Sequence, residues 1–113
     1  MTAVLEADRV LDAVGEPMRR ALLQRLRSGP RPVADLARDL PVTRPAVSQH
    51  LKVLMNAGLV SFERAGTRNV YRLRPEGLEP LRRWVEDLWD TALAGYAAEA
   101  ERIARTPGSS VAR

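Results

Sequence analysis

The sequence contains no cysteine and a single histidine, His50, among its 113 residues. Without cysteine the chain can form neither a disulfide framework nor a thiolate metal site. One histidine cannot make a metal site alone, and we expect His50 to be packed or hydrogen-bonded at the edge of a buried helix face rather than to act as a ligand or base. The sequence therefore predicts no metal and no other cofactor. A reducing cytoplasm suits such a chain.

Enzyme signatures and membrane segments are missing as well. The seven glycines form neither GxGxxG nor GxxxxGK, so no phosphate-cradling loop is visible. Ser48 and His50 lie two positions apart on an expected helix, so they do not face each other as a nucleophile and base would. No run approaches the about 18 consecutive apolar residues of a membrane span, and the N-terminal segment MTAVLEADRVLD does not have the pattern of a signal peptide. We expect a protein that is not an enzyme and does not enter a membrane.

The charge is unevenly distributed along a chain of ordinary globular composition, 45% hydrophobic and 28% charged, that is long enough for one domain. The net charge is +4, but residues 43–74 hold six basic side chains against Glu63 alone, whereas residues 78–105 hold four basic and six acidic ones. This contrast indicates that one segment meets a polyanion and the other does not. Solvated surface charge is an equally open alternative.

Apolar residues at helical spacing predict three helices in the first 40 residues: one over residues 3–14, one from Pro17 to a stop at Ser28-Gly29-Pro30, and a short one over residues 33–40. We expect Gly15 to end the first helix, because glycine accepts the left-handed conformation at a helix C-terminus. Pro17 suits the first position of the second helix, where its missing N–H is not needed.

A fourth helix follows a tight turn, which is the length pattern of a helix-turn-helix. Thr43 is a suitable N-cap for it, and Gly58 ends it after Ala57. The next residues, LVSFERAGTRNVYRL, alternate in character around a glycine-containing turn and predict a β-hairpin, the wing. A last helix runs from about 80 to 105. The expected fold is mainly α with a small β-hairpin: a dimeric winged helix-turn-helix over residues 1–105, with a disordered tail at 106–113.

The fourth helix has one apolar and one hydrogen-bonding face. At about 100° per residue, Val47, Leu51 and Leu54 point to the core, and the opposite face carries Pro45, Ser48, Gln49, Lys52 and Asn56. Gln, Ser and Lys side chains can pair with base edges, and Arg44 at the helix N-terminus can reach a phosphate or a base. A polar face without a partner is the alternative. The short helix before it and the basic hairpin after it favour DNA recognition.

The hairpin carries Arg64, Arg68 and Arg72 with only Glu63 nearby as a counter-charge. Cations at a narrow tip are what a wing needs to follow a minor groove or its phosphates, and we expect Arg68 to lead. The alternative is protection of a sheet edge against aggregation.

The last helix has more apolar surface than one core requires, because its apolar residues cover far more than an arc of about 100°. Self-association, with the first helix joining the interface, is the simplest explanation, and two recognition helices would then read a palindrome with half-sites about 34 Å apart. A monomer, or a ligand pocket lined by aromatic residues of this helix, are alternatives. The expected interface residues are Val4, Leu11, Leu81, Trp84, Leu88, Trp89, Ala92 and Tyr96.

Three stretches resemble the ArsR/SmtB family of winged-helix repressors over about residues 8 to 95. They are DAVGEPMRRALLQRL, then VADLARDLPVTRPAVSQHLKVLMNAGLV followed by ERAGTRNVYRL, and finally WVEDLWDTAL, which is similar to the metal-independent autorepressor branch. The resemblance implies a homodimer that binds an inverted repeat in the operator of its own or a neighbouring gene. By position it implies DNA contacts from Thr43, Arg44, Ser48, Gln49, Lys52 and the wing residue Arg68.

The chain departs from the metal-sensing members of that family. They carry cysteine pairs near the helix-turn-helix or acidic and histidine sets on the last helix, whereas this chain has no cysteine and no histidine between Leu78 and Arg105. The sequence thus predicts a homodimeric DNA-binding repressor that senses no metal, and it names no small-molecule effector. A winged-helix protein-interaction module, or a ligand-responsive regulator with an apolar pocket at the last helix, are the alternatives.

Overall fold

The computed structural model describes the backbone of residues 2–105 and the side chains of residues 6–105. The chain divides into two units, one up to Leu81 and one from Arg82 onward, which are described separately. The tail expected at 106–113 lies outside the described residues, and the single domain expected over residues 1–105 stays a prediction. None of the described helices is both long enough and apolar enough to cross a lipid bilayer.

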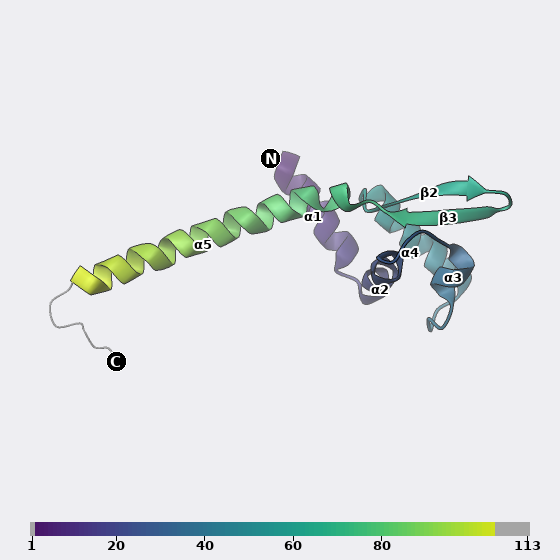
Figure 1. Ribbon diagram of the computed structural model, residues 1–113, viewed down its shortest axis with the longest axis horizontal. Helices are drawn as coiled ribbons and strands as arrows, with labels where there is room; N and C mark the ends of the chain where they lie inside the picture. Colours follow the sequence, from purple (N-terminus) through teal and green to yellow (C-terminus); the bar gives the residue numbers. More distant parts are fainter. Residues whose placement is uncertain (1, 106–113) are drawn as a thin grey trace. The chain divides into compact units, whose positions relative to one another are not determined.

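The first unit packs four helices and a small sheet around one core (Figure 1). The helices are α1 (Thr2–Val14), α2 (Pro17–Leu26), α3 (Val33–Ala37) and α4 (Arg44–Asn56). The core residues come from all four helices, from two strands and from Leu59 between α4 and β2: Ala7, Val10, Ala13, Leu22, Leu26, Leu36, Val47, Leu51, Leu54, Leu59, Val60 and Tyr71. The three residues that α4 was expected to turn inward are therefore all buried.

The predicted hairpin is confirmed as strands β2 (Val60–Ala65) and β3 (Arg68–Leu73), which pair antiparallel. Gly66 has φ +66° at the turn, a conformation that glycine adopts without strain. The rings of Phe62 and Tyr71 face each other across the strands with their centroids 5.3 Å apart, a cross-strand contact that helps to fix the register.

Two short elements were not expected from the sequence. Strand β1 (Arg31–Pro32) pairs with β3, so the sheet has three strands in the order β1-β3-β2. A 3₁₀ helix, η1 (Pro75–Leu78), leads into α5 (Glu79–Arg105). Two-residue strands and single 3₁₀ turns carry no periodic pattern that a sequence could reveal.

Two expectations about helix ends were wrong. Helix α3 ends at Ala37 instead of Leu40, because Arg38 is extended with ψ 130° and Asp39 follows with φ +65°, neither of which a right-handed helix accommodates. Gly15 does follow α1, but it is not among the glycines with a positive φ. The last carbonyls of α1 accept hydrogen bonds from Arg19 and Arg20 instead, so arginine side chains take the place of a left-handed cap.

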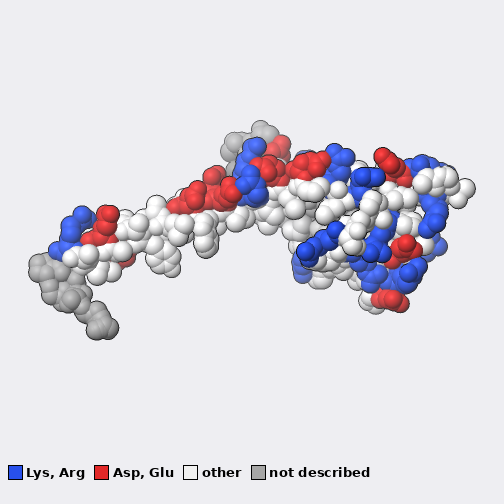
Figure 2. Space-filling model, viewed as in Figure 1, with Lys and Arg blue, Asp and Glu red and all other residues white. Residues whose placement is uncertain are grey.

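The second unit is α5 from Arg82 on, and none of the described residues of α5 is buried. Its large apolar side chains include Trp89, 64% exposed, and Tyr96, 75% exposed. Figure 2 shows acidic residues along one edge of this helix and uncharged side chains along the other. Ion pairs join Arg82 to Glu86 and Arg102 to Glu99 on the helix surface, where pairs of this kind add little stability.

Candidate nucleic-acid interface

Helix α4 begins at a well-formed N-cap. The Oγ1 atom of Thr43 accepts a hydrogen bond of 3.2 Å from the backbone N–H of Ala46, as its expected capping role requires. Pro45 lies in the first turn, where its missing N–H leaves no bond unmade. The cap fixes where the helix starts, and so places Arg44 at the positive end of the helix dipole, where an anion is favoured.

The outward face of α4 carries the side chains that the sequence singled out. Ser48, Gln49 and Lys52 are all exposed, opposite Val47, Leu51 and Leu54, which are fully buried. Because three core contacts hold the apolar face, the polar face has a fixed direction relative to the first unit. This is the arrangement in which a helix can present hydrogen-bonding side chains to the base edges of a major groove.

A hollow of about 400 Å³ lies between the start of α4 and the turn of the hairpin. It brings together three of the predicted DNA-binding residues, Arg44 and Ser48 from α4 and Arg68 from β3. Two cations that converge from separate elements on one open hollow favour an anionic occupant. The remaining lining residues are Val33, Pro45, Thr67 and Asn69.

The other predicted residues lie outside this hollow. Arg64 turns back on its own hairpin, where its Nε lies 3.4 Å from the carbonyl oxygen of Gly66. Arg72 pairs with Ser61 in the strand register, away from the turn, and its Nη2 is 3.6 Å from Oε1 of Glu63. Both side chains are exposed, so the hairpin remains cationic along its length, and Arg68 is the one of the three arginines that shares the hollow with residues of α4.

Three residues of the hollow were missed by the sequence analysis: Val33, Thr67 and Asn69. Thr67 and Asn69 flank Arg68, so the signal that marked Arg68 as the leading wing residue could have included them. Val33 starts α3, directly after the short strand β1 that pairs with β3, and α3 also packs against α4. Nothing in the local sequence indicates that contact.

His50 lies at the shoulder of α4, as expected, and is partly exposed. Its Nδ1 lies 3.5 Å from Nη1 of Arg19 and 3.9 Å from Oε1 of Glu16. The backbone N–H of Arg19, hydrogen-bonded to the Glu16 carboxylate, lowers the pKa of that carboxyl from its ordinary value. Among the described residues, no three His, Cys, Asp or Glu side chains gather closely enough to hold a metal ion.

The residues expected at a dimer interface divide between the two units. In the first unit Leu11 is 39% exposed, and Leu81 is partly buried against the core. In the second unit Trp84, Leu88, Trp89, Ala92 and Tyr96 are exposed. The side chain of Val4 lies outside the described residues. Apart from Leu81, the described members of this set make no contribution to the core of the first unit.

Comparisons with known proteins agree with this geometry. Residues 16–61 match the family model described as bacterial regulatory protein, arsR family. The chain is 53% identical over 97 residues to the HTH-type transcriptional regulator Rv2034 of Mycobacterium tuberculosis, covering 86% of this chain and 91% of that protein. It is 30% identical over 76 residues to the transcriptional repressor SdpR of Bacillus subtilis, covering 67% of this chain and 84% of the repressor.

A solved structure shows the same architecture. It is the homodimeric winged helix-turn-helix DNA-binding domain Mb0332 of Mycobacterium bovis, with a TM-score of 0.63 and 30% sequence identity. The match covers 80% of this chain and 83% of that one. The predicted winged helix-turn-helix fold is thereby confirmed.

Proposed function

The chain belongs to the ArsR family of bacterial regulatory proteins, and on that premise we propose that it is a homodimeric repressor of a palindromic operator that senses no metal. The regulators of this family bind DNA and are not enzymes. The chain is accordingly a transcriptional regulator with a winged-helix DNA-binding domain. What the proposal adds is the set of contacting residues, the dimer, the repression and the independence from metal.

The hollow between α4 and the hairpin turn is the observation that carries the proposal for DNA contact. It holds Arg44, Ser48 and Arg68 together beside the polar face of α4, which presents Gln49 and Lys52. A DNA strand lying here would place a phosphate between the two arginines and base edges against the helix. Three further residues complete the set of proposed DNA contacts by donating hydrogen bonds to the flanking DNA backbone: Thr43, Arg64 and Arg72.

The exposed apolar face of α5 supports the dimer. Complete burial of a fully exposed leucine side chain contributes about 1.5–3 kcal/mol, and Leu88, 57% exposed, and Trp89, 64% exposed, still have more than half of that apolar surface to bury. A second copy of the same helix is the occupant that the family suggests, since the Mycobacterium bovis domain is homodimeric. Two copies related by a two-fold axis would read the two halves of a palindrome.

Repression and metal independence rest on different observations. One relative with 30% identity is a transcriptional repressor by name, and a dimer bound to an operator would block the access of RNA polymerase to the same duplex. The chain offers no thiolate and one imidazole, so a softer transition metal would lack the ligands it prefers. We expect that Zn²⁺ or Ni²⁺ leaves DNA affinity unchanged.

Selection of bound sequences from a random duplex pool tests the proposal. We expect an inverted repeat with half-sites about one helical turn apart, and a mobility shift on a duplex that carries it. A matched duplex with one half-site scrambled should bind more weakly by about two orders of magnitude. No enrichment, together with no shift at low salt, would contradict DNA binding by this surface and favour the protein-interaction module.

A further inference from the structure

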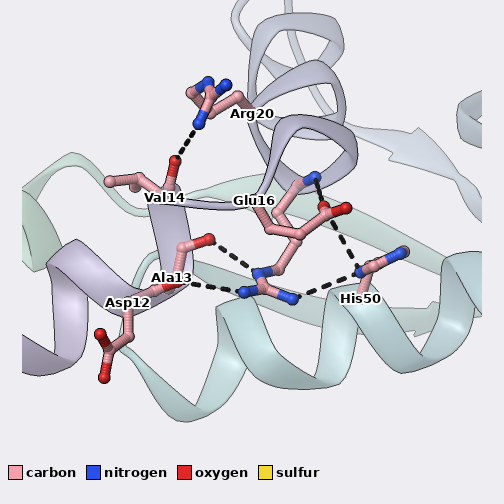
Figure 3. A network of polar contacts seen from close by, with 7 residues as sticks. Asp12, Ala13, Val14, Glu16, Arg20 and His50 are labelled. Atoms are coloured by element: carbon pink, nitrogen blue, oxygen red, sulfur yellow. Dashed lines mark hydrogen bonds and ion pairs between the residues drawn. The ribbon is translucent and has the colours of Figure 1, made fainter.

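The C-terminal end of α1 is held by two neighbouring arginines of α2 (Figure 3). Arg19 donates from Nε to the carbonyl oxygen of Ala13 at 2.7 Å and from Nη2 to that of Asp12 at 3.0 Å. Arg20 donates from Nη1 to the carbonyl oxygen of Val14 at 2.8 Å. These oxygens are the ones a helix end leaves without partners, and cations are favoured beside them.

Arg19 differs from Arg20 in reaching a third element. Its remaining nitrogen, Nη1, lies 3.5 Å from Nδ1 of His50, which belongs to α4 and is 31 positions away in the chain. A guanidinium group only donates hydrogen bonds, so this contact requires Nδ1 to accept and the imidazole to be neutral, with its proton on Nε2. One side chain thus joins the end of α1 to the recognition helix.

Glu16 competes with Arg19 for the same imidazole nitrogen. Its Oε1 accepts a hydrogen bond of 2.9 Å from the backbone N–H of Arg19 and lies 3.9 Å from Nδ1 of His50. With its lowered pKa, Glu16 stays ionised over the pH range in which a histidine titrates. A proton on Nδ1 would therefore pair the imidazolium with Glu16 and repel the guanidinium of Arg19.

Two further charged groups lie near Arg19. On α1, Arg9 and Asp12 line a hollow together with Arg19. From α4 the same hollow is lined by the uncharged residues Val53 and Asn56. Arginine and aspartate do not titrate between about pH 5 and 8. Imidazole is the kind of side chain whose ordinary pKa lies in that range, so a pH change there would act on this contact through a proton on the imidazole.

We infer that Arg19 positions the recognition helix through its contact with His50, and that protonation of His50 releases this contact and weakens sequence-specific DNA binding. The inference rests on the proposed function, because it concerns the same DNA-binding surface. His50 follows Gln49 directly in α4, so even a small local displacement toward Glu16, with the core face of α4 kept in place, would move the expected base-reading side chain. Contacts to phosphate tolerate such a shift better than bidentate contacts to a base.

The pH dependence of specificity tests the inference. We would measure the ratio of affinities for the selected operator and for a scrambled duplex at pH 8 and at pH 5.5, in the wild type and in His50→Gln. The glutamine amide can still accept from Arg19 and does not titrate. We expect the ratio to fall about tenfold in the wild type, the size typical of a local coupling, and to stay constant in the variant. Equal pH profiles would overturn the inference.

Two arginine variants separate positioning from general stability. Arg19→Ala should lower the specificity ratio at pH 8 and abolish its pH dependence, whereas Arg20→Ala, which removes the same charge and an equivalent bond to α1, should keep both. Because Arg19→Ala also removes two hydrogen bonds from the end of α1, Arg19→Lys is the reserve variant if the alanine protein does not fold.

The wild-type protein distinguishes failure of this inference from failure of the proposed function. Operator binding at pH 8, with a specificity ratio that does not change with pH, would contradict only this inference. Absence of any binding at pH 8 would contradict the proposed function as well.

Discussion

The two units of this chain differ in how much of their apolar surface they bury. Twelve hydrophobic side chains are buried in the unit that ends at Leu81, and its polar face is built on that core. From Arg82 to Arg105 every described residue is exposed, although the helix carries seven large apolar side chains. Those seven are Trp84, Val85, Leu88, Trp89, Leu93, Tyr96 and Ile103.

This difference indicates that the two units have separate roles. The first unit can stabilise its own fold and present a cationic surface, while α5 is long, apolar on one side and acidic on the other, and therefore suited to a protein partner rather than to DNA. We expect substitutions in α5 to affect assembly and substitutions on α4 and the hairpin to affect recognition. The four changes below test that division, beginning with the largest expected effect.

Leu88→Glu in α5 should convert the dimer to a monomer, because a carboxylate cannot be buried in an apolar interface without a partner. Loss of the second recognition helix should weaken operator binding by about 100-fold. Ala94→Glu is the matched control, since Ala94 lies about 120° around the helix from Leu88 at 100° per residue. Sedimentation and anisotropy titration would measure both effects. A Leu88→Glu protein that remained dimeric would show that the α5 face is not the interface.

Gln49→Ala should relax base preference at one position of each half-site by about 1–3 kcal/mol, the value of a bidentate contact to a base. Asn56→Ala is the control, because Asn56 lies at the other end of α4 and lines a different hollow. Competition with a set of single-base operator variants is the measurement. If Gln49→Ala kept its full preference at all positions, α4 would not be the reading element.

Arg68→Ala should weaken binding to every sequence about equally and reduce the slope of log affinity against log salt by about 1, since one phosphate contact is lost. Arg27→Ala removes the same charge from a residue that lines a separate hollow with Leu23 and Leu59. DNA titrations at several salt concentrations distinguish the two variants. Equal salt slopes in both variants would show that Arg68 does not contact DNA.

Asp39→Gly should stabilise the first unit by about 0.5–1 kcal/mol without changing DNA affinity, because glycine adopts φ +65° without the strain that an L-residue carries there. Asp39→Ala should have the opposite effect on stability, by a similar amount. Thermal or denaturant unfolding gives the sign of the change in the free energy of unfolding. Destabilisation by both substitutions would mean that the aspartate side chain, rather than the backbone conformation, holds this turn.

Much of this division could be predicted from the sequence, since it depends on periodicity and local turn chemistry. The spacing of Val47, Leu51 and Leu54, the cap at Thr43 and the glycine-containing hairpin turn are local signals, and the structure bears them out. Leu40 packs against the core although its helix ends early, because burial and helix length are separate properties.

The features that were missed depend on contacts between distant segments. Helix α3 ends early at Arg38, which is extended and whose carbonyl oxygen accepts a hydrogen bond from Arg25 of α2, and strand β1 exists only because Arg31 and Pro32 lie beside β3. The arginine caps on α1 replace the expected role of Gly15, and the contact of Arg19 with His50 joins residues 31 positions apart. No local pattern encodes such long-range pairings.

Amide chemical-shift mapping with a duplex that carries the selected operator tests the central claim most directly. The account predicts that the largest changes fall on residues 43–52 and 66–69, at the start of α4 and the turn of the hairpin, while backbone amides of α5 beyond Arg82 change little. Changes confined to α5, or a start of α4 that stays unaltered at saturating duplex, would contradict the account.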